Sequence, residues 1–186
     1  MGVAYNRDMK LYFVRHGETD VNSGLQKANT SQFDEPLNAA GIAQAEQLAE
    51  HLRDTTFDAI ISSPLQRTMQ TAKIINKFHN LDVKIDDVWR ELKTNNYLDA
   101  TSWHNAFDFD NNEVIEGIEP ICDFFERIYM ALDNLKATYG KDESVLVVSS
   151  GGVHQAVYAY VNSLPLTGNM RLSPMKNCEY REYEIV

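Results

Sequence analysis

The chain has 186 residues and a formal net charge of −10, from 17 Lys and Arg against 27 Asp and Glu. A chain of this length forms one domain and buries about 70% of its unfolded surface, so it needs no disulfide or metal to fold. The acidic balance argues against nucleic acid or an anionic membrane as the main partner, although arginines in a cleft can still hold a small anion.

The termini and the cysteines add little to this outline. Cys122 and Cys178 have no metal-binding or redox spacing, which is typical of reduced thiols in a cytoplasmic protein. No segment reaches 18 apolar residues, and no apolar signal core is present. Residues 1–8 are polar and irregular, so we interpret them as a flexible extension or the remnant of a tag. Residues 9–186 are then a single domain, and its oligomeric state cannot be read from the sequence.

The first half of the chain alternates strand and helix patterns. Residues 10–14 are rich in strand formers and end just before Gly17. Asn38 precedes a helical pattern over 39–52 and is a favourable N-cap. A second strand is expected at 57–61, then a helix capped by Ser63 with Pro64 at its first position, and a short strand at 83–85.

The second half continues the alternation after an irregular insertion or lid at about 93–116. Trp103, His104, Phe107 and Phe109 in this insertion either cover the substrate or anchor the insertion to the core. The apolar stripe from Ile118 to Leu135 predicts a long helix closed by Gly140. A buried strand at 144–149, a helix at 152–162 and a last strand at 179–186 follow.

This alternation predicts an α/β fold of three layers, α/β/α, around a mostly parallel, doubly wound sheet. In such sheets ligands bind beyond the carboxyl ends of the strands. Arg15-His16, Ser62-Ser63 and Ser149-Ser150 each directly follow an expected strand. The three pairs should therefore meet at one edge of the sheet.

Arginine and histidine at such an edge suit a phosphate ester. The planar guanidinium of arginine can bind two phosphate oxygens, and a neutral imidazole can attack phosphorus near neutral pH. Arg15 and His16 are adjacent, so both reach one ligand only where the strand has ended and turned. Gly17 gives the backbone the freedom for that turn.

Three motifs resemble those of the histidine phosphatase superfamily, the phosphoglycerate-mutase-like family. They are Arg15-His16-Gly17-Glu18-Thr19 with Asn22, then Ser62-Ser63-Pro64-Leu65-Gln66-Arg67 with Thr71-Ala72, and Ser149-Ser150-Gly151-Gly152, which resembles the family's SHGG segment with a serine at its histidine. Pro36-Leu37-Asn38 with Gly41 and Gln44-Ala45 also resembles a helix start of the family. The resemblance implies a phosphoglycerate-mutase-like fold and phosphoryl transfer through a phosphohistidine on His16. It also implies that Arg15, Asn22, Arg67 and Gly151 hold the phosphate, with no metal and no cofactor. The expected partner is a small phosphorylated substrate or inorganic phosphate.

Glu91 is the candidate proton donor. Arg90-Glu91-Leu92 resembles the segment where the family keeps a carboxylate, which would protonate the leaving alkoxide and then activate water. The family often continues with a glycine and Trp-Glu-Gly, whereas this chain continues with residues 93–99 of another kind. The match is therefore partial, and an ordinary surface glutamate is the alternative.

Ser150 departs from the family at its second active-site histidine. A serine is shorter and neutral, and losing a preorganised transition-state donor costs about 10²–10³ in rate. The serine is an introduced substitution, or a natural feature of a member that binds without catalysis, or a change for which His154 substitutes. The short chain favours hydrolysis of a phosphomonoester. The alternatives are a non-catalytic phosphate binder and a phosphoglycerate-type mutase, and specificity is expected in residues 23–35 and 93–116.

Overall fold

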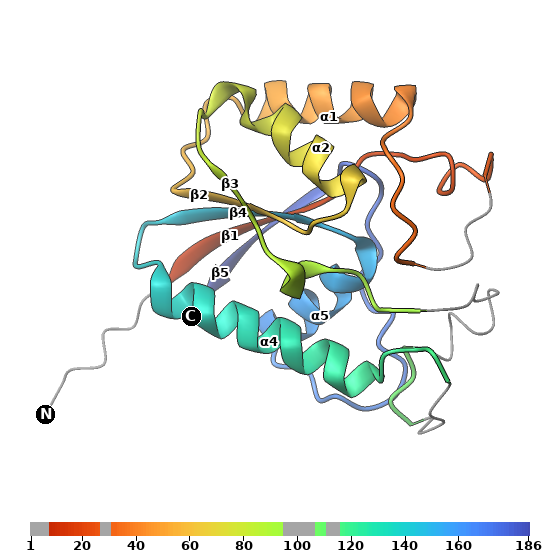
Figure 1. The fold of residues 1–186 in the computed structure, drawn as a ribbon. Coiled ribbons are helices and arrows are strands. Elements are labelled where there is room, and N and C mark those ends of the chain that lie inside the picture. Colours follow the sequence, from red (N-terminus) through yellow and green to blue (C-terminus); the bar gives the residue numbers. More distant parts are fainter. Residues whose placement is uncertain (1–7, 27–30, 95–106, 111–115) are drawn as a thin grey trace, which may run out of the picture.

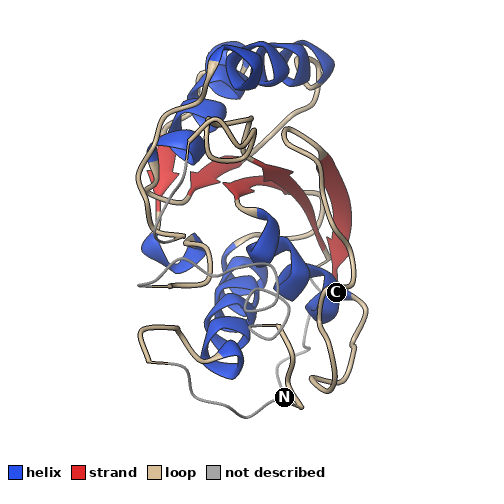
Figure 2. Ribbon diagram, turned by 90° about the vertical axis from the view of Figure 1, so that its right-hand side faces the viewer, coloured by secondary structure: helices blue, strands red, loops and turns tan. Residues whose placement is uncertain are grey.

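The computed structural model describes residues 8–26, 31–94, 107–110 and 116–186, and these ranges form a three-layer α/β/α fold (Figure 1). One sheet of five strands has helices on both faces (Figure 2). The strands are β1 (Met9–Arg15), β2 (Ala59–Ser62), β3 (Val83–Ile85), β4 (Ser144–Ser149) and β5 (Tyr180–Ile185). The helices are α1 (Ala39–His51), α2 (Gln66–Ile75), α4 (Ile121–Thr138) and α5 (Gly151–Val161), with short 3-10 turns η1 (Asn76–Phe78) and η2 (Asp87–Trp89). No helix in the described ranges is long and apolar enough to cross a membrane.

The sheet confirms the predicted doubly wound class. Its strand order is β3-β2-β4-β1-β5, and only the edge strand β5 runs antiparallel to its neighbour. All residues of β4 are buried, as expected for a central parallel strand. Arg15 lies opposite Ser149 in the parallel register of β1 and β4, so the last residues of both strands stand side by side.

Each face of the sheet carries its own apolar core. Leu11 and Phe13 of β1 pack with α4 and α5 on one face, whereas Tyr12 and Val14 pack with α1 and α2 on the other. This follows from the alternation of side chains along a strand. Figure 1 shows the same two pairs of helices above and below the sheet.

The two predicted helix caps had different outcomes. Asn38 is the N-cap of α1, and its side chain accepts a hydrogen bond from Gly41 N at 2.9 Å, as predicted. The predicted cap at Ser63 is wrong, because α2 begins at Gln66. Asp34 Oδ1 accepts from Gln66 N at 2.7 Å, so a carboxylate from another loop takes the capping role, a partner that local sequence does not show.

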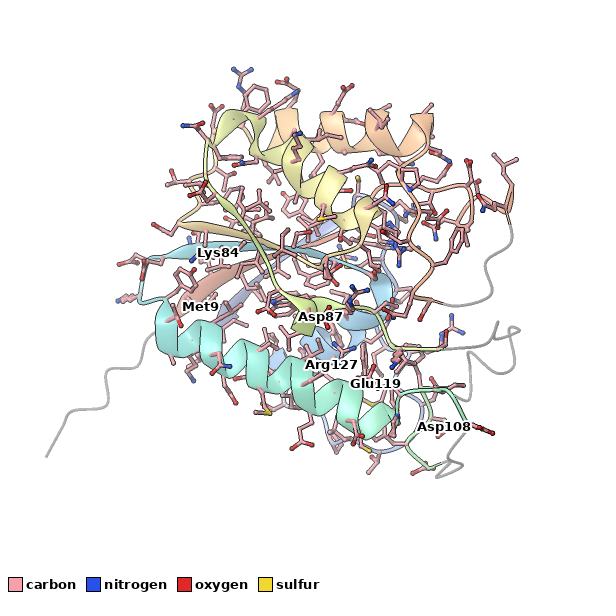
Figure 3. All side chains as sticks on the ribbon, viewed as in Figure 1. Met9, Lys84, Asp87, Asp108, Glu119 and Arg127 are labelled. Carbon is pink, nitrogen blue, oxygen red and sulfur yellow. The ribbon has the colours of Figure 1, made fainter. Side chains whose placement is uncertain are left out.

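The helix α4 begins three residues later than the apolar stripe predicted. Ile118 instead forms an isolated antiparallel bridge with Thr94, and α4 follows Pro120. Glu119 lies just before α4, and Arg127 lies on its second turn. Both side chains point toward the segment that follows β3 (Figure 3). The beginning of α4 is therefore tied to that segment.

Much of the expected insertion lies outside the described residues, including Trp103 and His104. Phe107 is buried with its ring 6.3 Å from that of Phe124, and the rings of Phe109 and Phe125 are 5.1 Å apart. These two aromatic residues thus anchor their segment to α4, which is one of the two roles considered for them.

The first turn of α1 packs directly on the turn after β1. A Cβ added at Gly41 would lie 2.1 Å from Glu18 O, and one added at Gly17 would lie 2.6 Å from Gly41 O. Asn38 N donates to Glu18 O at 3.0 Å across the same contact. Gly17 and Gly41 thus allow the backbone of the turn after β1 to contact the backbone at the start of α1.

We expect Gly41→Ala to destabilise the fold by about 1–3 kcal/mol, because the added methyl group meets backbone that cannot move away cheaply. An unhindered helix interior would instead gain about 1 kcal/mol from the same change. Urea denaturation measures the difference. Gly140→Ala is the matched control, since its Cβ would lie 3.4 Å from the nearest atom, a side-chain oxygen of Glu143. Wild-type stability of Gly41→Ala would contradict the tight contact.

Candidate active site

Three strand ends meet at one edge of the sheet, as the sequence predicted. His16 N donates to Ser149 O at 2.9 Å, which joins the ends of β1 and β4. Ser63 N donates to Val148 O at 3.2 Å, which joins the end of β2 to β4. The segments that carry the three candidate pairs are therefore in contact through their backbones.

His16 is a buried histidine whose tautomer is fixed by the backbone. Its Nδ1 lies 2.8 Å from Gly17 O, and because a carbonyl oxygen only accepts, Nδ1 carries the proton and Nε2 is left with its lone pair. Burial lowers the pKa of His16 well below 6.5, and the positive charges of Arg67 and Arg15 lower it further. The imidazole is thus uncharged at neutral pH.

The turn after His16 is held from α2. Gly17 N donates to Thr71 Oγ1 at 3.1 Å, and Thr71 Oγ1 donates to Arg67 O at 2.7 Å. Thr71 was recognised in the sequence only as part of a motif. The structure shows that its hydroxyl links the turn that bears the histidine to the helix that bears Arg67.

Both candidate arginines are largely buried beside His16, and the backbone holds them. Arg15 Nη1 donates to Met175 O at 2.5 Å, and Arg67 donates from Nη1 to Phe33 O at 2.8 Å and from Nη2 to Ser31 O at 3.1 Å. Burial lowers the pKa of each arginine, and the charge of Glu91 acts in the opposite direction on both. Each guanidinium has five N–H donors, so these bonds leave donors for an anion.

Glu91 is a buried residue, which excludes the surface-glutamate alternative. Its Oε1 accepts from Leu92 N at 2.8 Å, and its Oε2 accepts from Gly152 N at 2.9 Å. Burial raises the pKa of Glu91, while the two amides and then Arg67 and Arg15 oppose that rise. A Cβ at Gly152 would lie only 2.0 Å from Glu91 Oε1, so this position needs a glycine to admit the carboxylate.

Ser150 precedes the first residue of α5 and is 2% exposed. Its Oγ has no hydrogen-bond partner among the described residues, and the same holds for the buried Nε of Arg15. A Cβ on Gly151 would lie 3.6 Å from that Nε, so the first residue of α5 is packed against Arg15. Two buried polar groups thus flank a helix N-terminus, which favours anions.

Asn22 is connected to His16 through a residue that the sequence analysis missed. Asn177 Nδ2 donates to Asn22 Oδ1 at 3.1 Å and to His16 O at 3.0 Å. Asn177 belongs to the segment before β5, which carries no recognisable motif. The pairing of β5 with β1, together with the bonds from Cys178 N to Arg15 O and His16 O, brings it to the site.

His154, considered above as a possible site residue, bonds away from His16. Its Nδ1 lies 2.9 Å from Ser173 O, and its Nε2 lies 2.7 Å from Tyr183 OH. Its ring also packs on Phe13, in the core beneath the sheet. Both ring nitrogens are therefore engaged away from His16, because a residue one helical turn past Ser150 faces the sheet.

A protein-family model matches nearly the whole chain. The model of the histidine phosphatase superfamily (branch 1) matches residues 11–185. The chain belongs to the histidine phosphatase superfamily. The family resemblance inferred from the three motifs is thereby confirmed.

Two relatives are similar to this chain along most of their length. An uncharacterized phosphatase PhoE of Bacillus subtilis (strain 168) is 30% identical over 175 residues, which cover 91% of this chain and 87% of that protein. A probable phosphoglycerate mutase GpmB of Proteus mirabilis (strain HI4320) is 32% identical over 180 residues, covering 91% and 82%.

A solved structure confirms the fold. A mycobacterial glucosyl-3-phosphoglycerate phosphatase, determined in complex with VO3, superposes with a TM-score of 0.80 at 27% identity, covering 93% of this chain and 90% of that one. The fold is therefore phosphoglycerate-mutase-like, and superfamily membership supports an enzyme of phosphoryl transfer. Within the described ranges, no group of three or more His, Cys, Asp and Glu is arranged to hold a metal ion.

For the roles that the family resemblance implies for His16 and Glu91, their opposite pKa shifts predict a bell-shaped pH profile. The rate constant kcat/KM should rise as His16 loses its proton, at a pH well below 6.5, and fall as Glu91 loses its own, above the usual glutamate range. Glu91→Gln should lower kcat/KM for phenyl phosphate by about 10²–10⁴ and remove the alkaline limb. A pH profile of both proteins measures this, and an unchanged alkaline limb in Glu91→Gln would exclude Glu91 as its source.

Because of His154, the protein should become less stable as the pH is lowered below about 6.5. Burial lowers its pKa from 6.5 to about 4, so between these values the unfolded chain binds the proton and the folded chain does not. The free energy of unfolding then falls by up to about 1.4 kcal/mol per pH unit as the pH is lowered through this window. Denaturant titrations at pH 7 and pH 5 should show a smaller difference for His154→Gln than for the wild type. Equal differences would mean that His154 titrates normally.

Proposed function

We propose that this protein hydrolyses a small phosphomonoester, without a metal, through a phosphohistidine on His16. The observation that carries the proposal is the fixed tautomer of His16, whose Nδ1 is bonded to Gly17 O. The arrangement leaves Nε2 as a neutral nucleophile between two arginines and a buried carboxyl group. This combination suits attack on phosphorus.

The first step transfers the phosphoryl group. His16 Nε2 attacks phosphorus, the bond from phosphorus to the ester oxygen breaks, and Glu91 gives its proton to the departing oxygen. Arg15, Arg67 and Asn22, with the amide of Gly151, hold the other phosphate oxygens. Because Gly17 O accepts from Nδ1, it stabilises the positive charge that the imidazole ring gains when it is phosphorylated.

The second step returns the enzyme to its starting state. Water attacks the phosphohistidine, Glu91 takes the proton of that water, and inorganic phosphate leaves neutral His16 behind. Glu91 thus alternates between general acid and general base. The amides of Leu92 and Gly152 stabilise its charged form, and burial stabilises its protonated form.

Ser150 weakens this chemistry without removing it. In our proposal its hydroxyl donates to the phosphate at the place where the family has a charged imidazole. A hydrogen bond from a neutral donor stabilises by about 1 kcal/mol or more less than a charge-assisted one. The serine side chain is also shorter than that of histidine, so it stabilises the transition state less. The chain is therefore expected to be a slow phosphatase.

Two other functions rest on particular observations. Ser150 favours a protein that binds phosphate without turnover, since its hydroxyl cannot supply the positive charge of a histidine. The similarity to a probable phosphoglycerate mutase favours a mutase, in which the phosphohistidine would return its phosphoryl group to an organic acceptor. Hydrolysis is preferred because water needs no second substrate subsite.

The proposal predicts opposite effects for two substitutions. Ser150→His should raise turnover of an aryl phosphate by about 10² or more, because a transition-state donor is restored. His16→Ala should abolish turnover in either background. His51→Ala is the matched control, since His51 is an exposed histidine at the end of α1 that pairs with Tyr180.

The same assay separates the alternatives. Phosphate binding by calorimetry with no turnover, in wild type and in Ser150→His, would contradict hydrolysis and support the binder. Transfer of phosphate between the hydroxyls of 3-phosphoglycerate, faster than release of inorganic phosphate, would support the mutase. Retained turnover in His16→Ala would exclude His16 as the nucleophile.

A further inference from the structure

The segment that carries Glu91 has little regular structure of its own. Strand β3 ends at Ile85, the turn η2 ends at Trp89, and residues 90–93 belong to no helix or strand. A buried carboxyl group on such a segment can be held in place only by contacts from neighbouring elements. The position of the proposed general acid therefore depends on side chains outside the segment.

Arg127 of α4 grips this segment by its carbonyl oxygens. Its Nη1 donates to Val88 O, and its Nη2 donates to Arg90 O at 2.9 Å and to Glu91 O at 3.3 Å. Figure 3 shows Arg127 lying beneath the segment that contains Asp87. One guanidinium thus spans the backbone from the residue before Trp89 to Glu91 itself.

Glu119 holds the guanidinium and the other end of the segment. Its carboxylate accepts from Arg127 Nε at 2.6 Å and from Nη2 at 3.0 Å, a two-point ion pair. The same carboxylate accepts from Lys93 N at 3.0 Å, and Glu119 N donates to Lys93 O at 2.8 Å. The pair therefore brackets Glu91, with contacts on both its N-terminal and C-terminal sides.

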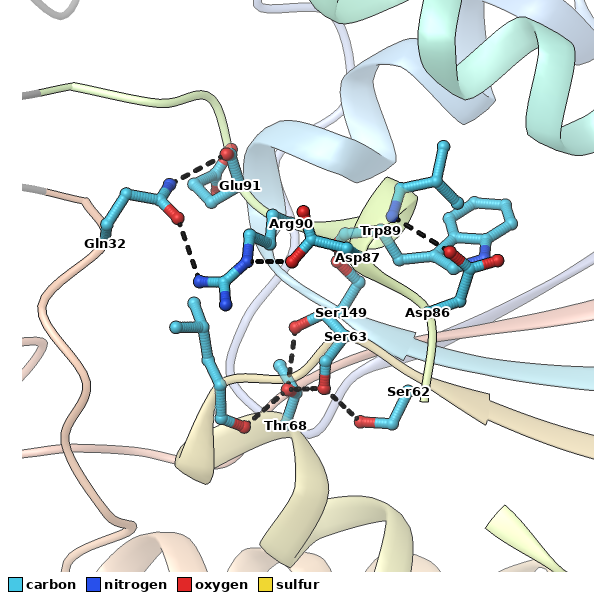
Figure 4. Close-up of polar contacts among 12 residues, drawn as sticks. Gln32, Ser62, Ser63, Thr68, Asp86, Asp87, Trp89, Arg90, Glu91 and Ser149 are labelled. Atoms are coloured by element: carbon cyan, nitrogen blue, oxygen red, sulfur yellow. Dashed lines mark hydrogen bonds and ion pairs between the residues drawn. The ribbon is translucent and has the colours of Figure 1, made fainter. Parts of the chain in front are cut away.

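The opposite side of the segment is held less strongly. Gln32 Nε2 donates to Glu91 O at 3.0 Å, and its Oε1 accepts from Arg90 Nη1 at 3.2 Å (Figure 4). Ser149 Oγ donates to Trp89 O at 2.5 Å from the end of β4. These bonds join neutral groups or involve Arg90, which is partly exposed, whereas Arg127 and Glu119 form a two-point ion pair that contacts the segment on both sides of Glu91. We therefore call Arg127 and Glu119 the main clamp.

The clamp is more buried than a surface ion pair. The side chains of Arg127 and Glu119 are 24% and 17% exposed, and the guanidinium stacks 4.7 Å from the ring centre of Phe124. Exposed pairs contribute little, but a partly desolvated, two-point pair resists displacement, and a lysine could not reproduce its planar fork.

We propose that Arg127, braced by Glu119, is the positioning residue that keeps the Glu91 carboxyl group in line with the leaving oxygen of the substrate. This inference rests on the proposed function, because it assigns a purpose to the place that Glu91 occupies. Arg127 touches neither His16 nor the phosphate-binding arginines in the described contacts. It acts through the backbone of residues 88–91.

The test compares two esters of similar shape that differ in their need for an acid. Phenyl phosphate releases a basic phenolate and needs a proton from Glu91, whereas 2,4-dinitrophenyl phosphate releases a stable anion and needs none. Arg127→Gln should lower kcat/KM for phenyl phosphate on the order of 10- to 100-fold, since a misplaced acid loses most of its effect. For the dinitrophenyl ester, the change should stay within about threefold.

Controls separate positioning from folding. Arg53→Gln removes an arginine that also pairs with a glutamate but is 54% exposed. Arg53 follows α1, on the face of the sheet opposite α4, so this variant should hydrolyse both esters like the wild type. Arg127→Lys keeps the charge without the two-point pair and should show the same selective loss, so it replaces Arg127→Gln if that variant does not fold. Parallel losses on both esters would overturn the proposal and leave Arg127 a structural residue.

A second readout does not depend on turnover. The amides of Leu92 and Gly152 both donate to Glu91, so a displaced carboxyl group should make both exchange hydrogen faster in Arg127→Gln. The amide of Val147 in the core of β4 should not change. If the wild type hydrolyses neither ester, the hydrolase proposal fails. The exchange data alone then show whether Arg127 positions the carboxyl group of Glu91. Unchanged exchange at Leu92 and Gly152 would overturn it.

Discussion

The site depends on keeping one histidine uncharged next to two arginines. Burial and the charges of Arg67 and Arg15 all lower the pKa of His16, so the proton leaves the ring well below neutral pH. The carbonyl of Gly17 then decides which nitrogen keeps the remaining proton. The same arginines that suppress protonation of His16 are suited to hold a phosphate, so one arrangement of charges would produce both the nucleophile and the anion site that we propose.

That arrangement in turn rests on close backbone contacts. Gly41 and Gly17 let the start of α1 touch the turn after β1, and Gly152 lets the start of α5 touch Glu91. Both contacts lie at the carboxyl edge of the sheet, where the strand ends supply the site. The first turns of α1 and α5 therefore help to position the turn after His16 and the carboxyl group of Glu91.

The sequence predicted what depends on local pattern and on motifs. The alternation of strands and helices, the Asn38 cap and the meeting of Arg15, His16 and Ser150 follow from periodicity and from strand ends. It could not reveal contacts between distant segments. Asp34 displaces Ser63 from its expected capping role, and Asn177 and Arg127 reach the site from regions without a motif. Such partners are set by tertiary packing, which leaves no periodic trace in the chain.

The most direct test of the account is a rapid-quench experiment with a ³²P-labelled aryl phosphate, stopped in alkali and followed by mapping of the labelled peptide. The account predicts alkali-stable, acid-labile phosphate on the peptide that contains His16, formed as fast as the phenol is released and absent from His16→Ala. Turnover in which phenol release is accompanied by no label on His16 at any time, and which survives His16→Ala, would contradict it.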